Sequence, residues 1–129
     1  MLENKAVLSG HFNDFNKEQQ ELIWYTLKLC WSGEILILVD NHESLLQLKE
    51  EDDIIVPEIE RIEKIRDYVN DWKRKYREYP RVTIRLFDTK ETTERLIEEF
   101  YPDLLIVNKN GGGTNLFNLK KRWPILIRN

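Results

Sequence analysis

The residues of this chain whose types and spacing could do chemistry stand near its start. A short apolar run ends at Gly10, and a polar segment after it carries His11, Asn16, Lys17 and Gln19. Glycine lets the backbone turn and approach a ligand closely, and the imidazole, amide and ammonium groups can donate hydrogen bonds to an anion. An amphipathic pattern follows, and a helix N-terminus favours phosphate. The segment therefore predicts an anion-binding loop between a strand and a helix.

A second candidate loop follows a later apolar run. It carries Asn108 and Lys109 and then three consecutive glycines, Gly111 to Gly113. The backbone amides of such a loop can cradle an anion. In an open parallel sheet the loops at the carboxyl ends of the strands share one edge, where ligands bind. We therefore expect both loops at the same edge, although a plain surface loop is the alternative for the second one.

The elements that must position these loops alternate along the chain. Apolar runs predict five strands: Lys5–Ser9, Glu34–Val39, Val82–Phe87, Asp103–Val107 and Pro124–Ile127. Helical periodicity predicts helices over Lys17 to Trp31, Pro57 to Tyr79 and Thr89 to Phe100, with a short turn of helix at Asn115–Lys121. The third strand alternates as an edge strand would. We therefore expect a single α/β domain over residues 1–129, Rossmann-like and doubly wound, with a five-stranded, mainly parallel sheet and helices on both faces.

Composition excludes several classes of protein. The net charge is −3, whereas nucleic-acid binding needs a basic face, so no nucleic-acid partner is predicted. No apolar run approaches the 18 residues of a membrane-spanning helix, and we expect no membrane association. Cys30 is the only cysteine, and we predict that it is a buried free thiol in a cytoplasmic protein. With His11 and His42 as the only histidines, no metal site is predicted.

Three segments resemble the cytidylyltransferase-like nucleotidyltransferases. Gly10–Asn13, followed by Asn16–Gln19, resembles the family's Gly-Thr-Phe-Asp and His-x-Gly-His motif in spacing. Glu60-Arg61 resembles the Glu-Arg segment of its middle helix, and Tyr101–Gly111 resembles its later Pro-Asp-strand-Gly segment. The layout is most similar to glycerol-3-phosphate cytidylyltransferases and heptose-phosphate adenylyltransferases. The resemblance implies a nucleotide ligand, CTP or ATP, a homodimer, and Mg²⁺ if the protein is active.

The candidate nucleotide- or phosphate-binding residues come from these loops and from cations that could serve them. They are Gly10, His11, Phe12, Asn16, Lys17, Gln19, Lys49, Arg61, Asn108, Lys109 and Gly111. For Arg61 the alternative is an ordinary surface ion pair. The tryptophans are expected in the core or in an interface.

The residues that handle phosphate in that family are replaced here. Asn16 and Gln19 stand at the two histidine positions and Glu18 stands at the glycine. Neutral amides form weaker bonds to phosphate than charged donors do. No counterpart of the family's final Ile-Ser-Thr-Thr motif is found in the sequence. We therefore expect a degraded catalytic motif in a nucleotide- or phosphate-binding or interaction module, and we assign no catalytic residue.

Two alternatives stay open at this point. The first is an active cytidylyl- or adenylyltransferase acting on a sugar- or polyol-phosphate, in which His11, Lys17, Lys49 and Arg61 replace the missing histidines. The second is a structural protein that uses the fold as a dimer scaffold, with its tryptophans and the long helix from Pro57 as the contact face.

Overall fold

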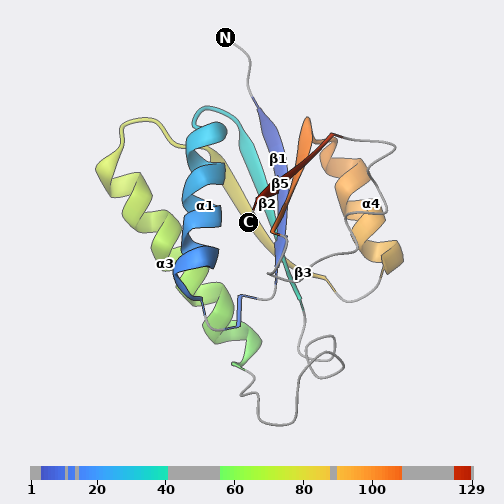
Figure 1. Ribbon diagram of the computed structural model, residues 1–129, viewed down its shortest axis with the longest axis horizontal. Coiled ribbons are helices and arrows are strands. Elements are labelled where there is room, and N and C mark those ends of the chain that lie inside the picture. Colours follow the sequence, from blue (N-terminus) through green and yellow to red (C-terminus); the bar gives the residue numbers. More distant parts are fainter. Residues whose placement is uncertain are drawn as a thin grey trace.

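The computed structural model is built from alternating strands and helices (Figure 1), and it describes residues 4–10, 12–13, 15–40, 56–87, 90–108 and 124–128. The elements in chain order are β1 (Lys5–Gly10), α1 (Lys17–Leu29), β2 (Glu34–Asp40), α3 (Glu58–Lys75), β3 (Arg81–Phe87), α4 (Lys90–Phe100), β4 (Leu104–Asn108) and β5 (Ile125–Arg128). The strands form one sheet in the order β3-β2-β1-β4-β5, and every neighbouring pair is parallel. The α/β fold with a parallel sheet is therefore as predicted, and β3 is an edge strand.

Two helices cover one face of the sheet and one covers the other. Figure 1 shows α1 and α3 side by side on one face and α4 on the opposite face. The apolar run Ile35–Val39 of β2 is buried throughout, because its alternate side chains enter the two halves of the core. Ile35, Ile37 and Val39 pack toward α1 and α3, whereas Leu36 and Leu38 pack toward α4.

The apolar stripes of the helices explain how they sit. Ile65, Val69 and Trp72 follow one another at helical spacing on α3, and all three are buried. On α1 the buried stripe consists of Leu22, Ile23, Thr26 and Leu27. No helix among the described residues combines the length and the apolar character that crossing a membrane requires.

The third predicted helix ends at Phe100 as expected, but the first two were predicted too long at their carboxyl ends. The first ends at Leu29 rather than Trp31, and the second ends at Lys75 rather than Tyr79. Tyr76 adopts extended backbone angles, φ −125° and ψ 141°, so that the chain can turn toward β3. The predicted turn of helix at Asn115–Lys121 lies outside the described residues.

Gly33 closes the connection from α1 to β2. A Cβ atom on this residue would lie 1.8 Å from the carbonyl oxygen of Asn4, so no side chain fits here. The close approach lets the Glu34 N–H donate to the same Asn4 oxygen at 3.1 Å and start the pairing of β1 with β2. Glycine at this position is therefore a requirement of the sheet.

Candidate functional site

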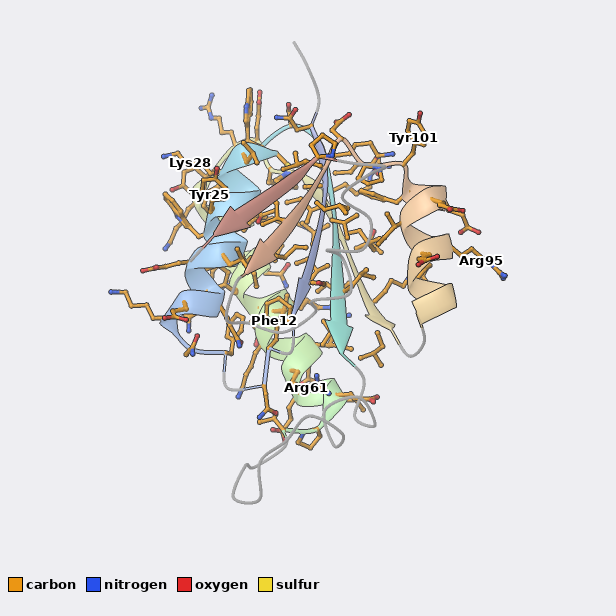
Figure 2. The ribbon with its side chains drawn as sticks, turned by 45° about the vertical axis from the view of Figure 1, so that its right-hand side comes forward. Phe12, Tyr25, Lys28, Arg61, Arg95 and Tyr101 are labelled. Carbon is orange, nitrogen blue, oxygen red and sulfur yellow. The ribbon has the colours of Figure 1, made fainter. Side chains whose placement is uncertain are left out.

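The first predicted loop lies at the carboxyl end of the central strand. Gly10 ends β1 opposite Val39 of β2. On the other side β1 pairs with β4 in a register that places Leu8 beside Ile106. Asn108 follows Ile106 by two residues, as Gly10 follows Leu8, so the two predicted loops begin at the same edge of the sheet. Figure 2 shows Phe12 near this end of the molecule.

Two aromatic rings of this loop are directed into the protein. Phe12 and Phe15 both adopt left-handed backbone angles, with φ of 53° and 44°, which bulky residues rarely do. Phe12 is 1% exposed. Its ring centroid lies 6.5 Å from that of Phe15, and Phe15 meets Tyr68 of α3 edge-on at 5.9 Å. The unusual backbone therefore serves to bring both rings under the helices.

The amide side chains of the loop bind its own backbone. The Asn16 oxygen accepts the Gln19 N–H at 3.0 Å and caps α1, as its position before the helix predicts. The Gln20 amide donates to the Phe15 carbonyl at 2.8 Å. The Val56 N–H donates to the Asn13 side-chain oxygen at 2.7 Å, which ties the loop to the start of α3.

Arg61 is part of the interior rather than of the surface. Its side chain is completely buried, and its Nε donates to the Val56 carbonyl at 3.0 Å. Val56 is thus held on one side by Asn13 and on the other by Arg61. A buried charged group is costly unless it is hydrogen-bonded, so this contact fixes how α3 begins. The alternative of a surface ion pair does not describe Arg61.

The other predicted site residues have different surroundings. Lys17 is exposed and lies 4.0 Å from Glu21, an ion pair on the surface of α1. Gln19 is half-buried in the first turn of the same helix. His11, Lys49, Lys109 and Gly111 lie outside the described residues. Among the described residues, no three His, Cys, Asp or Glu side chains gather closely enough to hold a metal ion.

A groove lies at the other end of the helices, and sequence reasoning did not identify it as a site. It has a volume of about 630 Å³ and is formed by the second half of α1, the last turn of α3 and the residues that follow the two helices. We call it the aromatic groove. Its lining residues are Trp24, Lys28, Trp31, Trp72, Tyr76, Arg77 and Glu78.

The rings of the aromatic groove contact one another in an ordered way. Trp72 lies at its base and is 7% exposed. Trp24 meets it edge-on at 6.1 Å, and Tyr76 stacks on it at 4.3 Å. Trp24, Trp31 and Tyr76 nevertheless remain 40%, 40% and 46% exposed. The groove is therefore preformed, and much of its aromatic surface faces solvent.

The charge of the aromatic groove differs from that of the whole chain. The Lys28 ammonium lies 5.0 Å from the centre of the Trp24 ring, a cation–π contact. Arg77 and Glu78 complete the rim, which gives two cations and one carboxylate. Basic residues at the ends of α1 and α3 are also favoured by the helix dipoles. A partner with negative charge therefore suits the rim.

Two titratable groups near these helices have shifted pKa values. Burial, helped by the charge of Asp103, raises the pKa of the Cys30 thiol to about 12, so the thiol is protonated and unreactive at neutral pH. Burial, together with Glu21, raises the pKa of Tyr68. Neither shift prepares a nucleophile or a base for chemistry at neutral pH.

Comparison with known proteins gives a likeness of fold. No protein-family model and no curated protein matches this chain. A crystal structure of a protein from the universal stress protein family of Burkholderia pseudomallei is similar to it, with a TM-score of 0.53 and 17% sequence identity. The similarity covers 97% of this chain and 95% of that chain.

The resemblance to cytidylyltransferase-like proteins is therefore wrong, because the structural likeness is to another superfamily. The reason lies in what the matched residues do. Asn16 caps α1 and Arg61 hydrogen-bonds the backbone at the start of α3, so both side chains make contacts within the fold. Their spacing thus reflects a parallel α/β sheet rather than one family's chemistry. What the comparison shows for this chain is the fold that it shares with a universal stress protein family member.

Proposed function

We propose that this protein is a binding module that receives part of a protein partner in the aromatic groove. The observation that carries the proposal is that four rings, from α1, α3 and the residues that follow them, surround a preformed groove and three of them stay exposed. Aromatic residues and arginine are enriched at the centres of protein interfaces. A preformed groove also reduces the conformational entropy that binding costs.

The rim indicates which partner fits. Lys28 and Arg77 favour carboxylates, and the aromatic floor favours aromatic or aliphatic side chains. We therefore propose an acidic segment with apolar anchors as the occupant. A nucleic acid would meet the Glu78 carboxylate and a chain of net charge −3, which favours a protein partner instead.

The groove can be tested with a hexapeptide of four glutamates and two tyrosines, followed by NMR of the tryptophan indole N–H groups. We expect the Trp24 and Trp31 signals to shift with a Kd of roughly 10 µM to 1 mM, typical of a small contact. The same peptide with lysine in place of glutamate should bind about tenfold more weakly, because charge complementarity is lost. Equal binding of both peptides would contradict the assigned partner class.

A matched pair of variants locates the binding. Trp31→Ala removes an exposed ring from the groove, whereas Ile59→Ala removes a side chain that is 71% exposed on α3 and does not line the groove. Trp31→Ala should lose its affinity for the peptide, and Ile59→Ala should retain the wild-type affinity. Loss in both, or in neither, would show that the peptide binds elsewhere.

A second candidate function is the binding of a nucleotide or another phosphate at the carboxyl edge of the sheet. It is favoured by the left-handed backbone at Phe12 and Phe15, since strained conformations gather at functional sites. ATP and CTP, each with and without Mg²⁺, should then raise the melting temperature. Ligand at 100 times its Kd adds about 2.7 kcal/mol. No shift at millimolar nucleotide would exclude this candidate.

A further inference from the structure

We propose that the aromatic groove of one copy receives an exposed tyrosine, with its acidic neighbours, from a second copy of this chain. The inference rests on the proposed function of the groove and names its partner. The donor consists of the last turn of α4 and the residues that follow it, which we call the Tyr101 corner: Glu99, Tyr101, Pro102 and Asp103.

Tyr101 is presented to solvent by a strained backbone. Its side chain is 76% exposed, the highest value among the large apolar side chains in the described part of the chain. Its φ of 54° is left-handed, and its N–H donates to the Ile97 carbonyl at 2.9 Å as α4 ends. Pro102 follows and is buried. The backbone of Tyr101 is thus fixed, whereas its ring lies outside the core. An exposed aromatic ring on a fixed backbone is suited to anchor an interface.

Hydrogen bonds to β1 fix the far side of the corner. The Asp103 N–H donates to the Lys5 carbonyl at 2.7 Å, and the Lys5 N–H donates to the Asp103 carboxylate at 2.8 Å. The Lys5 ammonium donates to the Phe100 carbonyl and lies 4.6 Å from the centre of the Phe100 ring. A corner held on both sides loses little freedom when it docks.

The charges and shapes of the two surfaces are complementary. Glu99 and Asp103 flank Tyr101 and are exposed, whereas Lys28 and Arg77 stand on the rim of the groove. The groove already stacks Tyr76 on Trp72 and leaves other aromatic surface open to a further ring. A tyrosine with two carboxylates near it in the sequence therefore suits an aromatic floor whose lining includes two cations.

One molecule cannot fill its own groove with its own corner. The groove lies on the face of the sheet covered by α1 and α3, and the corner follows α4 on the opposite face (Figure 1). Figure 2 shows Lys28 and Tyr101 on opposite sides of the molecule. The contact therefore joins copies head to tail. One tyrosine buries about 150–250 Å², far less than a standard interface, so the association is weak.

Sedimentation velocity of the full chain tests the contact. Between about 10 µM and about 1 mM, the range of weak complexes, the mean sedimentation coefficient of the wild type should rise with concentration. Tyr101→Ala and Trp31→Ala should each remain monomeric, and Ile59→Ala should behave as the wild type. Tyr76→Ala provides a second groove variant, and circular dichroism of each variant confirms that it folds.

Mixing the two defective variants is the decisive step. Trp31→Ala keeps its corner and Tyr101→Ala keeps its groove, so an equimolar mixture should form dimers that grow no further. Two results overturn the inference: a mixture that stays monomeric, or Tyr101→Ala that self-associates like the wild type. If the acidic hexapeptide still binds a protein that does not self-associate, the proposed function stands and only the partner is wrong. If the peptide also fails to bind, both proposals are wrong.

Discussion

The loop after β1 and the aromatic groove both gather aromatic and polar side chains, but they use them in opposite ways. In the loop Phe12 is 1% exposed, and the Asn13 and Asn16 side chains accept hydrogen bonds from the chain's own backbone. In the groove Trp31 is 40% exposed, and the Lys28 ammonium lies over the Trp24 ring at the rim. The described side chains of the loop are engaged in contacts within the chain, whereas the rings of the groove keep much of their surface exposed.

This difference shows how a motif should be judged. A residue type indicates that a side chain can donate, accept or stack, and the fold decides whether a partner inside the chain already satisfies it. Asn16 is suited to a phosphate but caps α1. Trp24 is suited to a core but lies off the buried stripe of the same helix. The more informative residues are therefore those that can still donate, accept or stack after their contacts within the folded chain are counted.

Truncating one ring from each region gives the largest expected contrast. Phe12→Ala removes a buried ring and should lower the free energy of unfolding by about 3–5 kcal/mol, the usual cost of such a cavity. Trp31→Ala should cost about 1 kcal/mol or less, because much of its ring is already in water. Urea unfolding of both variants measures the difference. Equal losses would mean that Trp31 belongs to the core.

The pH dependence of stability can show how well the fold excludes solvent from Cys30, the buried residue before Trp31. The folded-state pKa of Cys30 is about 12, above its ordinary value of 9.0, so above pH 9 the unfolded chain loses a proton that the native protein keeps. The free energy of unfolding should therefore fall by about 1 kcal/mol per pH unit above 9. Chemical denaturation at pH 8 to 11 measures it.

The matched control for that experiment is Cys30→Ala, which has no thiol to titrate. Its slope should be shallower than that of the wild type, and the remainder should include Tyr68, whose raised pKa acts in the same direction. Identical slopes in the two proteins would mean that solvent reaches Cys30 in the native state.

The smallest expected effect concerns the cap of α1. Asn16→Ala removes the acceptor of the Gln19 N–H and should cost about 1 kcal/mol. Asn16→Asp keeps an acceptor and adds a negative charge that the helix N-terminus favours, so it should restore most of the loss. Thermal unfolding at pH 7 compares the three proteins. If Asn16 instead served only to bind a ligand, Asn16→Ala and Asn16→Asp would have equal melting temperatures without phosphate. Their melting temperatures would then differ only when phosphate is added.

The fold could be predicted because its signals are local. The continuous apolar run Ile35–Val39 requires a strand that is covered on both faces, and the alternation at Val82–Phe87 marks an edge strand. The carboxyl ends of the first two helices were predicted two and four residues too late, whereas that of the third was predicted correctly. In the second helix Tyr76 fits the apolar period but its backbone is extended. A turn toward the next strand depends on the whole sheet and leaves little trace in the periodicity.

The candidate site could be predicted only in part. The location of the first loop followed from the order of strand and helix. The inward direction of its rings depends on left-handed backbone angles at Phe12 and Phe15, which cannot be predicted from the residue type phenylalanine. A signal for the groove does exist in the sequence. Trp24 and Lys28 lie four residues apart on α1, outside the buried stripe of Leu22, Ile23 and Leu27, and Trp31 follows the helix at the next helical spacing. Residues at this spacing lie on one face of a helix, so the sequence places these side chains together away from the core.

The central place of β1 has a consequence for how the protein is made. Of the strands of this sheet β1 is translated before the others, and it can pair with β2 once residues 34–40 have emerged. Its other edge is completed by β4, and the contacts between Lys5 and Asp103 join residues 98 positions apart. During translation of the segment between them, an apolar strand edge stands open. The nascent chain is therefore most vulnerable to aggregation in that interval, and a pause or a chaperone there would protect it.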